Sequence, residues 1–492
     1  MVKSNYNEIK SSKVLKTGGN IRIECLTDIS CNETDVISLS ANISQKVCEC
    51  VNGQVNIGGK LVFNIVYFLE GEIRRKEIGE EFTEKLNLDY VTDQDVAKVN
   101  FCVEGLNTEK ADRLSLYAII SYDLGVEKET LHNVLTNGEG CVCDSAKVPY
   151  CENLTKVGGV FTLEDEFETS IIKNVLSSSS VATINSCQCG IGNVVCDGEI
   201  ILSLLLLMEE KNVILKERRI IPFRLELEAP ELSATDTAYV NVLVNKTSLK
   251  VYVDEGKNKS SVCSYVTITL NGNAYKIKDI EYIGDLFSCE NELSIAKECI
   301  ENTFVLGCES TIEKISGKAF CDSPNSANLI NTFDERVYAL NQKVEDGNLI
   351  LEGIVSCNAM FELGGNFITK TAELPVTIKI DANGENVTDL TCIAKDVKAS
   401  LKNGEIEMSC ELCISYKKSK VKTFNFITSL SETDVIIAED SAFSLYIPQE
   451  GDTLWNVCKA LKVSPQVITE QNPQVEYPLV GNEKIIVYRQ IK

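Results

Sequence analysis

The sequence predicts a mainly β protein, with three tandem antiparallel β-sandwich-like repeats followed by a small βααβ domain. Three observations indicate this organisation. Short apolar segments alternate with turn residues, one pattern of such segments occurs three times, and helical periodicity is confined to the carboxyl end. At 492 residues the chain is also too long for a single hydrophobic core, which favours several domains.

A glycine-led apolar strand begins the recurring pattern in each of its three copies. These strands start at Gly59, Gly198 and Gly353, and each is followed by a second strand and then by a third. The step from the second strand to the third is seventeen residues in every copy, which indicates internal homology. The steps run from Phe82 to Val99, from Phe223 to Val240 and from Val376 to Ile393.

The strands have the alternation of an antiparallel sheet with one buried face. Residues 240–244 and 406–412 alternate apolar with polar or mixed side chains. Turn pairs such as Asn271-Gly272 and Asn403-Gly404 separate neighbouring strands, as in sandwiches built from hairpins. We expect an amino-terminal tail at 1–19, repeats at 20–150, 155–277 and 280–430, an acidic linker at 431–443, and the βααβ domain at 444–490.

Two short helices are predicted within the carboxyl-terminal domain. From Leu454 to Leu461, apolar residues recur at positions i, i+3, i+4 and i+7, which gives one apolar helix face. Ser464-Pro465 is a capping residue followed by proline at the first helical position, and this second helix must end near Asn472-Pro473. Residues 446–447 and 484–488 are expected to form strands on either side of the helices.

The charge balance limits the classes of partner. The chain has 72 acidic and 48 basic residues and a formal net charge of −24 at pH 7, which repels nucleic acid and anionic membrane surfaces. The longest apolar run, 200–208, is about half as long as a membrane-spanning helix, so we expect a buried strand and no membrane insertion. Residues 1–10 lack the apolar core of a signal peptide, and we therefore expect a cytosolic protein.

The chain contains 21 cysteines and a single histidine, His132. Zinc sites that mix the two residue types are therefore practically excluded. Two cysteine groups could supply part of an all-thiolate site, but they do not recur at matching places in the repeats. We expect the cysteines to act as small buried hydrophobes, without a metal site and without a complete disulfide framework. The two groups are Cys141, Cys143 and Cys151, and Cys187, Cys189 and Cys196.

No catalytic constellation stands out, and we expect a protein that is not an enzyme and has no cofactor. His132 lies in Thr-Leu-His-Asn without a nucleophile motif, and we expect it in a loop. The carboxylates at 164–166 could be nominated as a glycosidase pair, but their partial recurrence at Glu290 and Glu292 indicates a repeated structural edge. A phosphate-binding loop motif is absent from the sequence.

The carboxyl-terminal domain resembles a LysM domain. The resemblance is carried by residues 451–455 (Gly-Asp-Thr-Leu-Trp), 463–465 (Val-Ser-Pro), Asn472-Pro473, and Gly481 before an apolar strand. LysM domains commonly bind N-acetylglucosamine polymers between the first of these loops and the loop after the second helix. The resemblance therefore implies a groove for a protein partner or for this glycan. Its residues are Gly451, Asp452, Thr453 and Leu454 on one side and Asn472 and Pro473 on the other.

Trp455, the only tryptophan of the chain, has two interpretations. It could stack on a sugar ring, or it could pack between a helix and a sheet. Packing is the more frequent role of a tryptophan in such a position.

The three repeats resemble SPOCS domains of spore-coat-associated proteins in their glycine-led strand, proline-flanked strand and Val-x-Val-type strand. Three such repeats followed by a LysM domain resemble the SipL-type family of clostridial spore coat morphogenetic proteins. This resemblance implies a scaffold in the mother-cell cytoplasm at the forespore surface, and hence in the spore coat. It also implies that the LysM domain binds stage IV sporulation protein A, the ATPase of the basal coat layer, and that the chain helps to localise other coat proteins.

Two further interpretations remain open. The protein could instead be an envelope protein that binds peptidoglycan or another N-acetylglucosamine glycan. The many edge strands of three sandwiches also predict self-association or edge pairing with partners.

Overall fold

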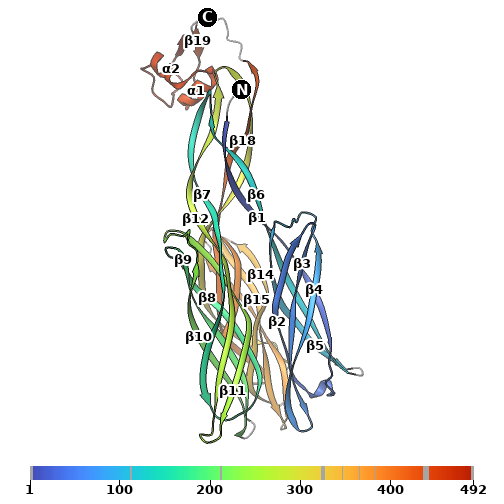
Figure 1. The fold of residues 1–492 in the computed structure, drawn as a ribbon. Coiled ribbons are helices and arrows are strands. Elements are labelled where there is room, and N and C mark those ends of the chain that lie inside the picture. The colour runs from blue at the N-terminus through green and yellow to red at the C-terminus, as the bar shows by residue number, and fades with distance from the viewer. Residues whose placement is uncertain are drawn as a thin grey trace.

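The computed structural model describes residues 4–110, 113–210, 213–322, 327–345, 347–364, 366–381, 383–435 and 443–488. Within these ranges the protein is mainly β, and its strands form antiparallel sheets. The predicted fold class is confirmed at this level. The sheets form three similar units, named here repeats 1, 2 and 3, and a small terminal module (Figure 1).

Repeat 1 consists of two three-stranded sheets that face each other. One sheet has the order β1-β6-β5, and the other is the meander β2-β3-β4, which follows a short 3-10 helix, η1 (Glu33–Asp35). The strands are β1 (Ser4–Leu26), β2 (Val36–Val51), β3 (Gln54–Leu69), β4 (Glu72–Asn87), β5 (Val96–Lys110) and β6 (Leu114–Gly138).

Repeats 2 and 3 have the same topology. Repeat 2 has the sheets β7-β12-β11 and β8-β9-β10, and repeat 3 has β13-β18-β17 and β14-β15-β16. The strands of repeat 2 are β7 (Cys141–Thr169), β8 (Ile172–Cys189), β9 (Asn193–Met208), β10 (Ile214–Glu228), β11 (Thr237–Asp254) and β12 (Lys259–Ser288). Those of repeat 3 are β13 (Asn291–Ala319), β14 (Asn328–Glu345), β15 (Asn348–Leu363), β16 (Asn366–Asp381), β17 (Asn386–Lys402) and β18 (Glu405–Val435).

The recurring sequence pattern marks equivalent strands in the three repeats. Gly59, Gly198 and Gly353 lie in β3, β9 and β15, the middle strand of each meander. Each glycine is directly opposite the residue that begins its seventeen-residue step, Phe82, Phe223 or Val376. A Cβ atom on Gly198 would lie 2.3 Å from the Phe223 ring, so the ring needs the space above the glycine.

The two sheets of each repeat enclose a core of aliphatic and aromatic side chains. In repeat 1, Leu61 and Phe63 of β3 face Leu116 and Ile120 of β6, and all four are fully buried. Repeats 2 and 3 have corresponding cores between their sheets. The alternation of buried and exposed residues along the strands thus places one face of each sheet inside its repeat.

A second core joins the three repeats to one another. Val66 from repeat 1, Leu205 and Leu207 from repeat 2, and Phe333 and Met360 from repeat 3 pack together. Leu205 and Leu207 of β9 face this second core, while the alternate residues Leu204 and Leu206 face the interior of repeat 2. The strand is buried on both faces, as expected from the run of apolar residues.

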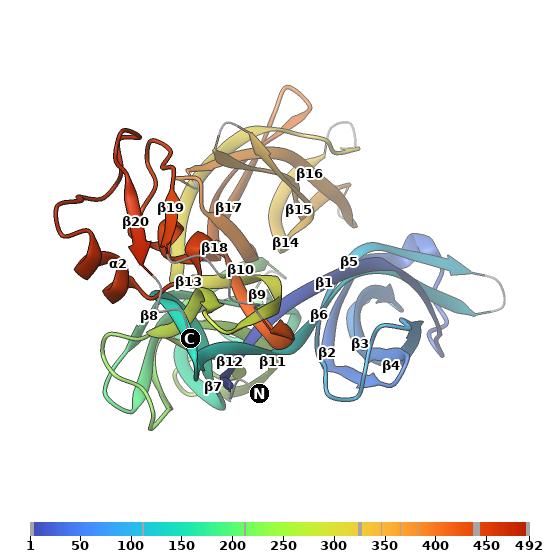
Figure 2. The same cartoon turned by 90° about the horizontal axis from the view of Figure 1, so that it is seen from above.

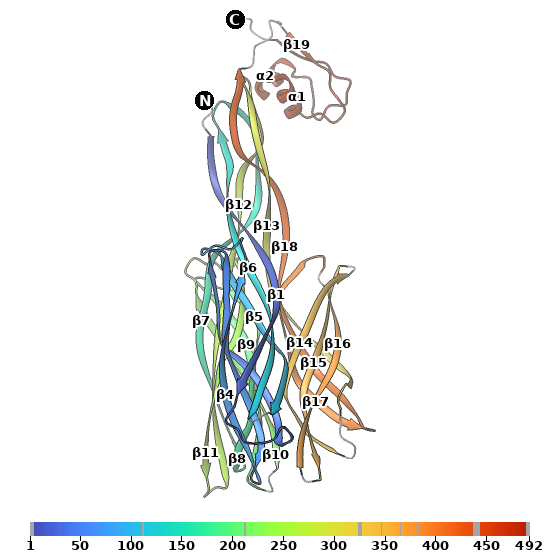
Figure 3. The same cartoon turned by 90° about the vertical axis from the view of Figure 1, so that its right-hand side faces the viewer.

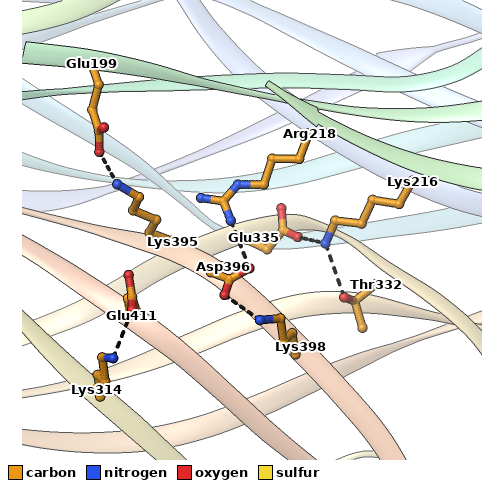
Figure 4. Close-up of polar contacts among 10 residues, drawn as sticks. All are labelled: Glu199, Lys216, Arg218, Lys314, Thr332, Glu335, Lys395, Asp396, Lys398 and Glu411. Carbon is orange, nitrogen blue, oxygen red and sulfur yellow. Dashed lines mark hydrogen bonds and ion pairs between the residues drawn. The ribbon is translucent and has the colours of Figure 1, made fainter. Parts of the chain in front are cut away.

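Polar contacts surround the junction of repeats 2 and 3 (Figure 4). Arg218 of β10 donates a hydrogen bond to Asp396 of β17 at 3.0 Å. Lys216 of β10 is ion-paired with Glu335 of β14, and a further pair joins Glu199 of β9 to Lys395 of β17. Strands far apart in the sequence are therefore held together by complementary charges.

The first and last strands of each repeat extend beyond its sandwich as a two-stranded ribbon. The ribbons β1–β6, β7–β12 and β13–β18 lie together and form a stalk (Figure 1, Figure 3). The turns at 139–140 and 289–290 join successive ribbons at the tip of the stalk. Seen from above, the repeats lie on different sides of this stalk (Figure 2).

Aromatic and aliphatic side chains from all three ribbons fill the stalk. Ile9, Val134, Tyr150, Ile300 and Phe426 are buried against one another. The ring of Phe426 meets that of Tyr282 edge to face at 4.9 Å between centroids. The stalk therefore has a hydrophobic core of its own, distinct from the cores of the sandwiches.

The structure changes several of the expected boundaries. Residues 4–19, expected as a tail, belong to β1 because they pair along β6. Repeat 1 ends at the 139–140 turn, since residues 141–150 already belong to β7, the first strand of repeat 2. Repeat 2 ends at the 289–290 turn, since β12 continues past residue 277 into the stalk. Of the expected linker 431–443, residues 431–435 extend β18, Phe443 begins the next strand, and 436–442 lie outside the described residues.

Among the residues that the structure describes, no helix has the length and hydrophobicity of a membrane span.

Replacing Phe426 by alanine is expected to loosen the stalk. Loss of a fully buried phenylalanine costs about 3–5 kcal/mol, because the neighbours cannot fill the cavity. Amide hydrogen exchange in the stalk parts of β6 and β18 should therefore become at least about 100-fold faster. The control is Phe320→Ala, because Phe320 is 70% exposed. Equal protection in the two variants would contradict the assigned stalk core.

Candidate functional site: the terminal module and its seat on the stalk

The terminal module contains two strands and two helices in the order β19, α1, α2, β20. These are β19 (Phe443–Tyr446), α1 (Leu454–Leu461), α2 (Pro465–Gln471) and β20 (Ile485–Tyr488). β19 pairs antiparallel with β20. Val457, Cys458, Ile468, Ile485 and Val487 form the centre of its small core.

The predicted groove begins at Gly451 and Asp452, in the loop before α1. Gly451 has a φ of +92°, which favours glycine, and its N–H donates to the Leu479 carbonyl at 2.8 Å. The Leu479 N–H in turn donates to the Asp452 carbonyl at 2.8 Å. The Asp452 carboxylate accepts hydrogen bonds from the Tyr446 hydroxyl and the Gln449 N–H. This carboxylate therefore stabilises the loop.

Thr453 and Leu454 begin helix α1. Thr453 is the N-cap: its side chain accepts from the Asn456 N–H, and the Asn456 side chain accepts from the Thr453 N–H at 2.9 Å. Such reciprocal capping satisfies amides that the helix leaves open. Leu454 is half-buried against the module core. These two residues thus have structural roles at the helix start.

Asn472 and Pro473 form the other predicted side of the groove. The Asn472 side chain is buried and donates to the carbonyls of Ile468 and Ile486, while it accepts from the Ile486 N–H. It therefore fastens α2 to β20 and is directed into the module. Pro473 is exposed. The loop contact with Gly451 and Asp452 is made at Leu479, further along the chain than Asn472.

The module is seated on the tip of the stalk through a second face of α1. The Trp455 indole N–H donates to Asp285 Oδ2 of β12 at 3.0 Å, and Lys459 Nζ donates to the same oxygen at 2.5 Å. The Trp455 ring lies 5.3 Å from the Phe287 ring, centroid to centroid. Lys462 forms an ion pair with Glu292 of β13 at 3.2 Å. The tryptophan packs against a strand of the stalk.

Sequence reasoning missed this contact, although a signal was present. Trp455 and Lys459 are four positions apart, which places them on one side of α1, separate from its apolar face, and Lys462 is the C-cap of the helix. Their partners Asp285 and Glu292 lie about 170 residues earlier in the sequence, so local patterns could not identify them.

The environment of Asp285 favours its charged form. Burial by itself would raise the pKa of this carboxyl, but the hydrogen bonds from Lys459 and Trp455 and the charge of Lys297 hold the pKa below its ordinary value. The carboxylate is 23% exposed, so solvent screens these contacts only in part. Asp285 is therefore an electrostatic anchor between the module and the stalk.

The outer face of the two-stranded sheet carries exposed apolar side chains. Phe443 is 58% exposed and Leu445 52% exposed, and strand alternation places them on the same face of β19. Tyr488 of β20 is directly opposite Phe443 and is 65% exposed. We name Phe443, Leu445 and Tyr488 the outer apolar face of the module.

The residues considered for catalysis are part of the framework. His132 lies within β6, and its expected loop position is wrong: its ring nitrogens contact Ser11 Oγ of β1 at 2.8 Å and Glu298 Oε2 of β13 at 3.2 Å. It thus joins two ribbons of the stalk. Asp165 of β7, one of the nominated carboxylates, accepts hydrogen bonds from Arg219 of β10.

Many of the cysteines are buried, and burial changes their chemistry. Even partial burial raises the pKa of Cys48 and Cys189 to about 11 and that of Cys392 to about 12, so these thiols stay protonated near neutral pH. Over the described part of the chain, no group of three or more His, Cys, Asp or Glu side chains is placed to hold a metal ion.

No protein-family model, curated protein or solved structure matches this chain.

Replacing Asp285 by alanine is expected to release the module from the stalk. The change removes two hydrogen bonds to a carboxylate, which contribute about 1–3 kcal/mol each. The emission of Trp455 should then shift to longer wavelength, because its indole becomes more hydrated, and no other tryptophan obscures the signal. Asp279→Ala is the matched control, since Asp279 is exposed on the same strand. An unchanged spectrum in Asp285→Ala would contradict the anchor.

Docking of the module is expected to weaken in acid. Docking depresses the pKa of Asp285. The stabilisation of docking by this carboxylate is therefore complete above the ordinary carboxyl pKa of about 4, and it is lost as the pH falls through the depressed pKa. A pH titration of Trp455 emission should show this transition in the wild type but not in Asp285→Asn. Far-ultraviolet circular dichroism should confirm that the sheets remain folded. The same acid transition in both proteins would count against this assignment.

Proposed function

We propose that this protein is a non-enzymatic scaffold of the spore coat, built from three SPOCS repeats and a LysM domain and related to the SipL-type morphogenetic proteins. Its terminal module recruits stage IV sporulation protein A, the ATPase of the basal coat layer. The repeats and the stalk hold this module at a distance from the body of the scaffold. The protein then helps to localise the coat around the forespore from the mother-cell cytoplasm.

The observation that carries the proposal is the placement of the module. It lies at the end of the stalk (Figure 1), held by Asp285 and Glu292, while its outer apolar face is turned to solvent. Exposed apolar side chains of this kind suit contact with another protein. A module so presented can reach a partner that the sandwiches do not touch.

The hydrogen bonding within the predicted groove favours a protein partner over a glycan. Sugar recognition requires polar groups that are free to bond to hydroxyls. The side chain of Asn472 is occupied by Ile468 and Ile486, and the carboxylate of Asp452 is occupied by Tyr446 and Gln449. The outer apolar face is therefore the better candidate for recruitment, and glycan binding is the alternative outcome of the test.

A binding experiment with the full-length chain tests the proposal. The chain is immobilised, purified stage IV sporulation protein A is passed over it, and N-acetylglucosamine oligomer is added as competitor. We expect the ATPase to be retained and the oligomer not to displace it. Leu445→Glu, which places a charge on the outer apolar face, should weaken retention at least tenfold. Val160→Glu, at a 65% exposed site of repeat 2, is the matched control.

Two results would overturn this assignment. Binding of the oligomer without retention of the ATPase would indicate an envelope protein that binds N-acetylglucosamine glycan. Hydrolysis of purified cell wall by the chain would indicate an enzyme.

A further inference from the structure

Three cysteine thiols meet where repeat 2 contacts repeat 3. Cys187 of β8 is directly opposite Cys196 of β9, and their sulfur atoms are 3.6 Å apart. The thiol of Cys308, from β13 of repeat 3, also interacts with that of Cys187. We name these residues the three-thiol cluster. Cys187 is its shared member, since its thiol interacts with those of both Cys196 and Cys308.

The backbone around the cluster holds β8 against β13. Ser310 Oγ of β13 donates to the Asn185 carbonyl of β8 at 3.1 Å. Each of these residues is two positions from a cysteine of the cluster, so this hydrogen bond places the segments that carry Cys187 and Cys308 side by side. Gly307, just before Cys308, has a φ of +143° at a register shift of β13. Such a bulge redirects the side chain that follows it.

We propose that Cys187 and Cys308 form a disulfide that joins repeat 2 covalently to repeat 3 when the protein meets a small-molecule disulfide oxidant such as oxidised glutathione. The Cys187 thiolate attacks one sulfur of the oxidant, forms a mixed disulfide and releases one glutathione. The Cys308 thiolate then attacks the Cys187 sulfur and releases the second glutathione. The two thiol protons pass to the two departing glutathione thiolates, and two electrons pass to the oxidant.

Cys308 rather than Cys196 is the final partner of Cys187 because the two differ in burial. Cys196 is fully buried in the core of repeat 2, whereas Cys308 is half-buried and can accept the oxidised sulfur without disturbing that core. A bond to Cys308, about 120 positions further along the chain, closes a far longer loop than a bond across the β8–β9 hairpin and therefore stabilises the folded protein more.

The cluster is slow to react near neutral pH. The hydrogen bond with Cys196 raises the pKa of Cys187, and the hydrogen bond with Cys187 raises the pKa of Cys308. Because the thiolate is the reacting form, oxidation should become about tenfold faster for each pH unit between 7 and 9. A reduced protein can therefore persist until exposure to oxidant is prolonged.

Peptide mapping of the oxidised full-length protein tests this inference. After treatment with oxidised glutathione, free thiols are blocked and the chain is digested with trypsin without reduction. We expect the peptides 174–211 and 298–314 to be joined. Cys187→Ser and Cys308→Ser should each lose this joined species. Cys189→Ser and Cys299→Ser are controls that should keep it, because each alters a neighbouring cysteine in the same peptide.

Circular dichroism of each variant would confirm that serine leaves the fold intact. A bond confined to peptide 174–211, a joined species that depends on Cys189 or Cys299, or no joined species at pH 9 would each overturn the proposal. The outcome does not depend on the proposed coat function, since the assay uses only the purified chain and a small oxidant.

Discussion

The architecture depends on the burial of side chains where three long ribbons meet. A two-stranded ribbon is at best marginally stable in water, because it has no second layer to cover its apolar face. Here each ribbon provides that layer for the other two, through residues such as Tyr150, Ile300 and Phe426. The side chain of Asn302 also joins two ribbons: its amide oxygen accepts a hydrogen bond from the Cys151 N–H, and its amide nitrogen donates one to the Cys151 carbonyl. The stalk can therefore extend well beyond the sandwiches (Figure 3).

The terminal module can dock where it does because the tip of the stalk carries the residues that it contacts. Asp285 and Phe287 belong to β12, and Glu292 belongs to β13, so the module contacts strands on both sides of one turn. This arrangement holds α1 by hydrogen bonds, an ion pair and a ring contact, while the sheet on the other side of the module stays open. A fixed orientation lowers the entropy cost of binding a partner, because the exposed face is already positioned.

Several parts of the candidate site could be predicted, and others could not. The limits of α1 and α2 follow from capping and apolar periodicity, which are local properties of the chain. The inward direction of Asn472 depends on β20, whose pairing with β19 spans the whole module. The partner of Trp455 could not be predicted, because Asp285 lies far away in the sequence and carries no distinctive motif.

The sequence by itself determined the strand class, the three repeats and their equivalent strands. Alternation, turn pairs and the glycine opposite Phe82, Phe223 or Val376 depend on residues that are close along the chain. Only the tertiary structure decided that residues 4–19 form a strand, that His132 lies between two ribbons, and that the module sits on the stalk. These features arise from contacts between residues more than a hundred positions apart, where shape and charge complementarity leave no local pattern.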